Sequence, residues 1–256
     1  DDVDLSHPVA CAAAICEHAP KAVINAAAYT AVDRAEEEEH LATVINGDAP
    51  TAMAEACALL GIPLVHISSD YVFNGIGGTP HSPDDATEPQ NAYGRSKLAG
   101  EIGIRNSGVV HAILRTSWVV SAHGMNFVTT MLRLSKTRDA LSVVADQIGG
   151  PTPARDIAVA CLQIAEQLVQ EPSKTGTYQF CGAPNVSWAE FAQEIFIQAD
   201  RSVTVTPIPT VDYPTPAKRP LNSRMDCRST EQVFDITLPD WKNGLKEILK
   251  RLEVIT

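Results

Sequence analysis

Short apolar runs alternate with helical patterns along the first two thirds of the chain. Apolar runs of this kind, separated by helices, are typical of parallel strands that helices cover on both faces. The alternation therefore predicts an α/β fold with a Rossmann-like, doubly wound parallel sheet. The expected strands are 21–28, 64–73, 112–120 and 141–145, and the expected helices are 9–19, 41–60, 92–105, 126–136 and 154–169.

The composition and the pattern of the sequence change after Glu171. Pro and Thr become frequent over 203–220, and short elements replace the regular alternation. We expect a smaller C-terminal lobe over the carboxyl edge of the sheet, where open α/β sheets bind ligands. Residues 1–150 are the expected cofactor-binding part, and 151–256 are mainly a substrate-binding lobe, partly interleaved with the first.

Three further elements are expected in this second part. They are a strand at 175–181, a helix at 187–198 and a terminal helix at 241–252. Ser187 with Glu190 three positions on is a capping box, which marks the start of the middle helix.

The composition limits the classes of function. A chain of 256 residues with 45% hydrophobic content can bury a sizeable core. The net charge of −11 argues against a nucleic-acid partner, because a phosphate backbone demands a basic surface. No apolar run reaches the length of about eighteen residues that a membrane span needs, and no signal peptide is visible. The six cysteines form no C-x-x-C pair, so we expect reduced thiols in a cytoplasmic protein.

Tyr93 and Lys97 stand four residues apart in an expected helix, and Ser69 stands near the end of an expected strand. Residues four apart share one helix face, so the phenol and the ammonium can point into one cleft. A tyrosine with a pKa of about 10 is a poor base at neutral pH, and a nearby ammonium would lower that pKa. The three side chains are typical of a carbonyl reductase, although Tyr-x-x-x-Lys alone is a weak signal.

The segment Asn25–Thr30 follows an expected strand and contains three alanines. Small side chains at this point let a flat cofactor approach the backbone. The alternative is that the alanines only pack beneath a helix, and the segment by itself favours neither interpretation.

Six blocks in order resemble the dTDP-4-dehydrorhamnose reductases, which are extended short-chain dehydrogenase/reductases. The blocks are 25–30, 68–73, 93–97, 115–119, 146–152 and 214–220. The resemblance covers nearly the whole chain. It implies reduction of the 4-keto group of dTDP-6-deoxy-L-lyxo-4-hexulose to dTDP-L-rhamnose, with NADPH or NADH as cofactor.

The resemblance also implies roles for individual residues. Ser69, Tyr93 and Lys97 match the catalytic positions. The cofactor contacts implied are Asp4, Leu5, Ala27, Ala28 and Thr30, together with Tyr93 and Lys97.

The substrate contacts implied are Ser69, Asp70, Trp118, Gln147 and Arg219, with Thr152 and Lys218 as further candidates. Trp118 could instead be an aromatic residue of the core. Lys218 and Arg219 could instead be a solvated pair on the surface. Some members of the family are associated with a divalent ion at a subunit contact. A homodimer and Mg²⁺ therefore stay open, and no spacing in this sequence locates a metal site.

The family begins with a strand, a glycine-rich turn and a helix, which supply backbone N–H groups to the cofactor pyrophosphate. The present sequence starts after them, and we expect a preceding segment of roughly 35 residues in the native protein. Without that segment, we expect weak cofactor binding and unpaired strand edges within the sheet.

Two other functions compete with a reductase. A homologous branch, the beta subunit of methionine adenosyltransferase, keeps the fold and regulates a partner enzyme. A nucleotide-sugar epimerase or dehydratase is the second alternative, and it would consume no NADPH overall.

Overall fold

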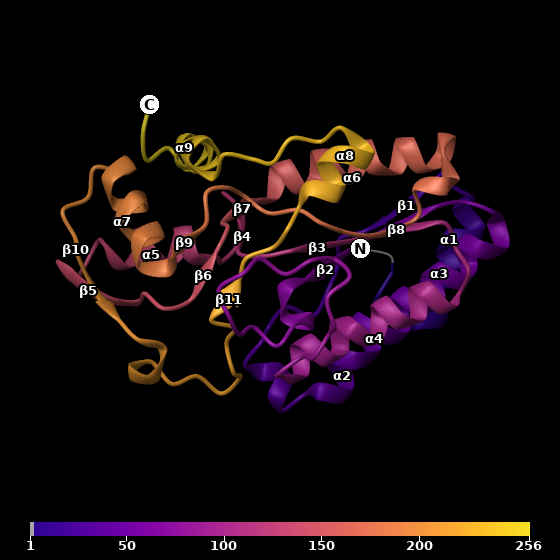
Figure 1. The fold of residues 1–256 in the computed structure, drawn as a ribbon, viewed down its shortest axis with the longest axis horizontal. Helices are drawn as coiled ribbons and strands as arrows, with labels where there is room; N and C mark the ends of the chain where they lie inside the picture. Colours follow the sequence, from indigo (N-terminus) through magenta and orange to yellow (C-terminus); the bar gives the residue numbers. More distant parts are fainter. Residues whose placement is uncertain (1–2) are drawn as a thin grey trace.

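The computed structural model describes residues 3–256. Asp1 and Asp2 belong to the segment 1–5, which we expect to be the end of the loop after the second strand of the family's fold, and they lie outside the described residues. The centre of the structure is a four-stranded parallel sheet (Figure 1). The strands lie in the order β1 (Val23–Asn25), β2 (Leu64–Ser69), β3 (His111–Thr116) and β8 (Gly176–Gln179). The predicted parallel α/β sheet is confirmed. The four strands form one unbroken sheet, and among the described residues β1 pairs only with β2, so its other edge is unpaired.

Helices cover both faces of this sheet (Figure 1). Leu64 points to the face packed by α1 (Pro8–His18), α3 (Ala49–Leu60) and α4 (Ala92–Asn106). Val65, the next residue, points to the face packed by α6 (Ala154–Gln170) and α8 (Arg228–Phe234). Both side chains are fully buried, which explains why the strand is apolar on consecutive residues.

A second lobe lies beyond the carboxyl end of the sheet (Figure 1). It contains the parallel pair β5 (Ala140–Val144) and β10 (Thr204–Ile208). Its core joins α5 (Phe127–Leu134), α7 (Trp188–Gln198) and α9 (Trp241–Arg251). The short strands between the lobe and the main sheet are β4 (Val119–Val120), β6 (Ile148–Gly149), β7 (Thr152–Pro153), β9 (Val186–Ser187) and β11 (Asn222–Ser223).

The chain passes repeatedly between the two regions. Strand β5 belongs to the lobe, whereas α6, β8 and α8, which come later in the chain, pack in or against the main sheet. A boundary at residue 150 therefore stays a prediction.

Local sequence predicted several element ends well. Ser187 and Glu190 form the expected capping box of α7, with the Glu190 N–H donating to Ser187 Oγ at 3.1 Å. All six cysteines are free thiols, as expected.

Other elements differ from the prediction. The expected helix 41–60 is divided into α2 (Glu39–Thr43), a π-helical turn η2 (Val44–Asp48) and α3. The expected strand 112–120 is interrupted before β4 by Trp118, whose φ is 49°. The expected strand 64–73 ends at Ser69, and 3₁₀ turn η3 (Asp70–Val72) follows it. Helix α8 and strand β10 were not predicted, and the remaining 3₁₀ turns are η1 (Arg34–Glu36), η4 (Pro172–Lys174) and η5 (Thr210–Asp212).

Candidate active site

Ser69 lies where β2 ends at the carboxyl edge of the sheet. Its Oγ accepts a hydrogen bond from the Tyr71 N–H at 3.2 Å, which starts turn η3. The same hydroxyl donates to Asp70 Oδ1 at 3.0 Å. Both Ser69 and Asp70 are buried. The turn thus fixes a hydroxyl and a carboxylate side by side.

Tyr93 lies in the first turn of α4. Asn91 caps the helix by accepting a hydrogen bond from the Gly94 N–H at 2.8 Å. Gly94 packs against the carbonyl oxygen of Tyr71, so closely that any side chain there would collide with it. The absence of a side chain lets Tyr93 approach Tyr71, with ring centroids 5.4 Å apart in an edge-to-face contact.

The phenol of Tyr93 meets the hydroxyl of Ser69. Burial raises the pKa of Tyr93 to about 12, a hydrogen bond with Ser69 opposes the rise, and the charge of Asp70 adds to it. Lys97 is not among the groups that shift this pKa. The expectation that Lys97 lowers the pKa of Tyr93 stays a prediction.

Lys97 makes its contacts elsewhere. Its Nζ donates to the Ile67 carbonyl at 2.7 Å and lies 3.2 Å from His66 Nε2. The side chain is buried, and burial lowers the pKa of Lys97 to about 8 against the opposing charge of Glu101. The Lys97 nitrogen is directed at β2.

Asp70 links the turn after β2 to the second lobe. Burial raises its pKa to about 6, and the nearby hydroxyls of Ser223 and Ser69 oppose the rise. Ser223 belongs to β11 and also lines the largest cavity near the site. The two regions of the fold thus meet at this carboxylate.

That cavity has a volume of about 1050 Å³. Tyr71, Trp118, Gln147 and Arg219 line it, so three expected substrate residues are brought together there. Gln147 is held by a hydrogen bond from its Nε2 to Thr210 Oγ1 at 3.1 Å.

Trp188 was not predicted as a site residue, and it lines the same cavity. It stacks on Trp118 with ring centroids 3.5 Å apart and an interplanar angle of 10°. Gly149 leaves room for this pair, because a Cβ there would lie 2.8 Å from Trp118 Cε2. No signal in the sequence identifies Trp188, since its role depends on a contact 70 positions away by residue number.

Lys218 and Arg219, the two cations expected among the substrate contacts, differ in position. Arg219 lines the cavity and pairs with Asp33, with Nη2 2.7 Å from Oδ2. Lys218 is exposed and donates to Gln90 Oε1 at 3.1 Å, outside the cavity lining. Thr152 also lies outside that lining, where its Oγ1 accepts from the Gly182 N–H at 3.2 Å.

The expected cofactor contacts lie near the N-terminus and after β1. Ala27 and Thr30 are exposed and Ala28 is half-buried, which leaves open backbone at the carboxyl edge. Asp4 is exposed and accepts a hydrogen bond from the Ser6 N–H at 2.8 Å. Leu5 packs on the cluster around Cys11 and Met53. The cofactor roles of these residues stay predictions.

Asn46 is a second residue that the sequence analysis missed. It lies in the π-helical turn η2, accepts from the Tyr29 N–H at 2.8 Å and donates to Ser96 Oγ at 3.0 Å. Ser96 Oγ in turn donates to the Tyr93 carbonyl at 2.7 Å. Asn46 thus joins the loop after β1 to the helix that carries Tyr93.

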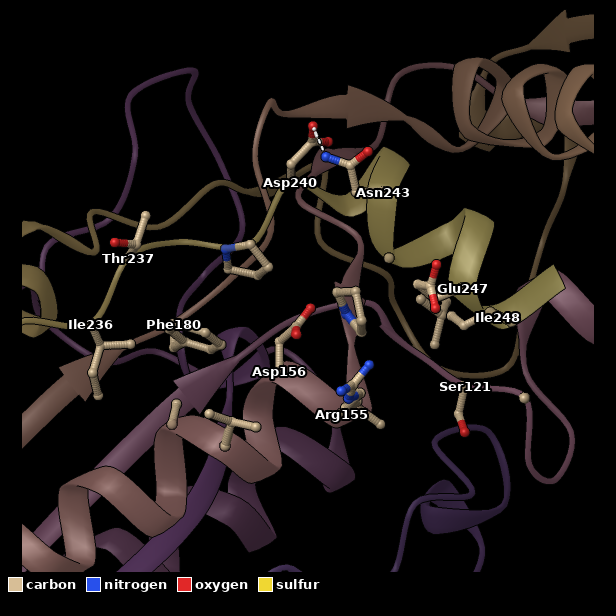
Figure 2. Close-up of a pocket in the computed structure, with 18 of the residues that line it drawn as sticks. Ser121, Arg155, Asp156, Phe180, Ile236, Thr237, Asp240, Asn243, Glu247 and Ile248 are labelled. Carbon is tan, nitrogen blue, oxygen red and sulfur yellow. Dashed lines mark hydrogen bonds between the residues drawn. The ribbon is translucent and has the colours of Figure 1, made fainter. Parts of the chain in front are cut away.

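A separate cavity of about 770 Å³ lies between the start of α6 and α9. Figure 2 shows Arg155 and Asp156 on one side of it and Glu247 and Ile248 on the other. No residue expected to act in catalysis lines it.

Two further findings concern metal sites and membrane-spanning helices. Within residues 3–256, no cluster of three or more His, Cys, Asp or Glu side chains is arranged to hold a metal ion. In the same part of the chain, no helix combines the length and the apolar character that crossing a bilayer requires.

Comparison with known proteins agrees with this geometry. The RmlD substrate binding domain family matches residues 1–254. A dTDP-4-dehydrorhamnose reductase of Sinorhizobium fredii is 44% identical over 252 residues, which are 96% of this chain and 85% of the relative. The enzyme of the same name from Escherichia coli is 39% identical over 259 residues, which cover 99% of this chain and 87% of the relative.

Solved structures give the same result. A dTDP-4-dehydrorhamnose reductase from Clostridium acetobutylicum superposes with a TM-score of 0.91 at 38% identity, covering 98% of this chain and 88% of that one. One from Bacillus anthracis, in complex with NADP, has a TM-score of 0.90 at 36% identity and covers 98% and 87% of the two chains. The chain therefore belongs to the RmlD substrate binding domain family, in which these relatives are dTDP-4-dehydrorhamnose reductases.

Proposed function

We propose that this protein is an oxidoreductase that reduces the 4-keto group of dTDP-6-deoxy-L-lyxo-4-hexulose to give dTDP-L-rhamnose. The observation that carries the proposal is the meeting of Ser69 and Tyr93 at the carboxyl edge of the sheet, next to a large cavity. The names of the relatives and the NADP complex of one of them support the substrate and the cofactor.

The cofactor is NADPH or NADH, which supplies a hydride to C4 when bound. The exposed Ala27 and the half-buried Ala28 fit a flat ring system, because they leave the backbone after β1 accessible. Tyr93 and Lys97 lie on the helix that faces this edge.

The proton for the resulting alkoxide comes from Tyr93. A pKa of about 12 keeps this phenol protonated at neutral pH, as a proton donor must be. Ser69 hydrogen-bonds the carbonyl oxygen and stabilises the negative charge that develops on it. The phenol O–H bond breaks as the new O–H bond of the sugar forms.

The cavity supplies the binding groups. Trp118 and Trp188 offer apolar faces to the sugar nucleotide. Arg219 provides the cation for the diphosphate, since a guanidinium matches two phosphate oxygens.

Turnover of the 4-keto sugar nucleotide with NADPH tests the proposal through the loss of nicotinamide absorbance. Tyr93→Phe should lower kcat by a factor of about 100 or more. Tyr178→Phe is the matched control, because that phenol donates to the Lys174 carbonyl, outside the site, and its loss should leave kcat unchanged.

Other outcomes contradict the proposal. Epimerised or dehydrated product without NADPH consumption would indicate the epimerase or dehydratase alternative. Binding to a synthetase without turnover would indicate the regulatory-subunit alternative. A homodimer and a cytoplasmic location stay predictions, and sedimentation of the purified protein tests the first.

A further inference from the structure

His66 is a buried imidazole that reaches Lys97. It lies within β2 and is fully buried. Its Nε2 is 3.2 Å from Lys97 Nζ, and its Nδ1 is 3.0 Å from Asn25 Nδ2. Parallel pairing of β1 with β2 places Asn25 directly beside His66. One imidazole therefore joins the end of β1 to the lysine of α4.

The surrounding hydrogen bonds decide which nitrogen of His66 carries the proton. The backbone N–H of Ala27 donates to Asn25 Oδ1 at 3.1 Å. Because a backbone N–H can only donate, the amide oxygen of Asn25 faces Ala27 and the amide NH₂ faces His66. His66 Nδ1 must then accept a hydrogen bond, so a neutral imidazole has its proton on Nε2. Burial lowers the pKa of His66 well below its ordinary value and keeps the ring neutral.

The Nε2–H of His66 is directed at the nitrogen of Lys97. An ammonium group has three donors and no acceptor, so it would oppose this N–H with another donor. A neutral amine resolves the conflict, because its lone pair accepts from His66 while it still donates to the Ile67 carbonyl. Burial lowers the pKa of Lys97, which also favours the neutral amine.

The other charged groups around Lys97 do not replace this contact. Glu101, one turn further along α4, raises the pKa of Lys97. Its carboxylate is engaged by Arg115 of β3, with Nη2 2.7 Å from Oε2. Tyr93, one turn earlier on α4, is a neutral phenol. Among the described residues, His66 is the only titratable side chain hydrogen-bonded to the Lys97 nitrogen.

We propose that His66, oriented by Asn25, is a positioning residue that donates a hydrogen bond to the Lys97 nitrogen and thereby favours its neutral amine form. The inference rests on the proposed reductase function, in which Lys97 is a catalytic residue.

The tautomer of His66 can be measured in the unmodified protein. In ¹⁵N NMR of histidine-labelled protein, with His66 assigned by His66→Gln, we expect a protonated Nε2 and an unprotonated Nδ1 near neutral pH. A proton on Nδ1 would overturn the proposal. This spectrum requires no substrate, so it remains decisive if the proposed reductase activity is absent or a variant does not fold.

Two substitutions should change the titration of Lys97 in the same direction. His66→Gln allows an amide oxygen to accept from the ammonium. Asn25→Asp places a carboxylate against Nδ1, which draws the imidazole proton to Nδ1 and turns Nε2 into an acceptor. In each variant we expect the Lys97 midpoint, followed by ¹³C NMR of the labelled side chain, to rise by about one pH unit, a tenfold change in the dissociation constant.

The catalytic profile should follow the NMR titration. The alkaline limb of kcat against pH should move upward by a similar amount, with KM for the sugar nucleotide unchanged. His111→Gln is the matched control, because His111 contacts the Val109 carbonyl outside the site and should shift neither curve. Unchanged Lys97 titration in both His66→Gln and Asn25→Asp would show a purely structural role and overturn the proposal.

Discussion

Arg219 Nη2 lies 2.7 Å from Asp33 Oδ2, and this contact joins the loop before β11 to the segment after β1. The two residues are far apart in the sequence, and the pair holds one cation at the wall of the large cavity. Within the described chain, Arg219 Nη1 has no hydrogen-bond partner. One nitrogen of the guanidinium is therefore fixed by Asp33, and the other is buried without a partner among the described residues.

Arg219→Ala should raise KM for the sugar nucleotide by a factor of about 10 to 100, because charge-assisted hydrogen bonds to phosphate are lost. Lys218→Ala is the control, since Lys218 is exposed and its partner is Gln90. Steady-state kinetics of the two variants would compare neighbouring cations directly. Equal effects on KM would show that position in the cavity wall does not matter.

Asp70→Asn should stabilise the protein at neutral pH. Burial raises the pKa of Asp70 from 3.8 to about 6, so the folded protein carries an energetic cost for the ionised form. The associated stability is fully present below pH 3.8 and is lost as the pH rises through about 6. Removing the charge should therefore gain up to about 3 kcal/mol above pH 7 and nothing at about pH 4.

Urea unfolding of wild type and Asp70→Asn from about pH 4 to about pH 8 measures this difference. If the difference in unfolding free energy between the two proteins stayed constant over the whole pH range, the prediction would be contradicted. Because Asp70 lies at the proposed sugar site, activity is expected to fall in the same variant, so stability and turnover are measured separately.

Arg115→Met should destabilise the fold by up to about 3 kcal/mol, because it removes the buried cation from the Glu101 carboxylate and leaves Arg105, at 2.6 Å, as the remaining one. Arg115 donates to Glu101 through Nε at 2.9 Å and through Nη2 at 2.7 Å. Both side chains are at most 2% exposed. Urea unfolding would measure the loss.

The double variant Glu101→Met with Arg115→Met is the informative comparison. Removing both charges leaves no buried carboxylate and only the partly exposed Arg105 without its partner, so the double variant should be more stable than Arg115→Met alone. A double variant that is less stable than the single one would show that the contacts of Glu101 with Arg105 and Ser68 contribute more than the burial of its charge costs.

The sequence predicted those features that depend on neighbours along the chain. The capping box of Ser187 and the apolar strand β2 are local patterns, and both were located from residues alone, although the expected strand continued to Phe73. The pairing of Trp118 with Trp188 and the π-helical turn at Asn46 depend on contacts between distant segments. No local pattern encodes them.

Lys97 shows, within the candidate site, that local sequence does not predict contacts between distant segments. Its spacing from Tyr93 correctly indicated a shared helix. The direction of its ammonium was decided by His66 on a neighbouring strand, and a one-dimensional pattern does not contain that contact. The roles expected for Asp4, Leu5 and Thr30 depend on a ligand and stay predictions.

The repeated passage of the chain between the main sheet and the second lobe has a consequence for how the cavity is built. Its walls combine Tyr71 from one region with Trp188 from the other, and the backbone links these regions through several separate connections. Neither half is a continuous stretch of sequence. A cut near residue 150 would separate β5 from its partner strand β10, and α5 from its packing partner α7. We therefore expect that fragments 1–150 and 151–256 do not fold independently.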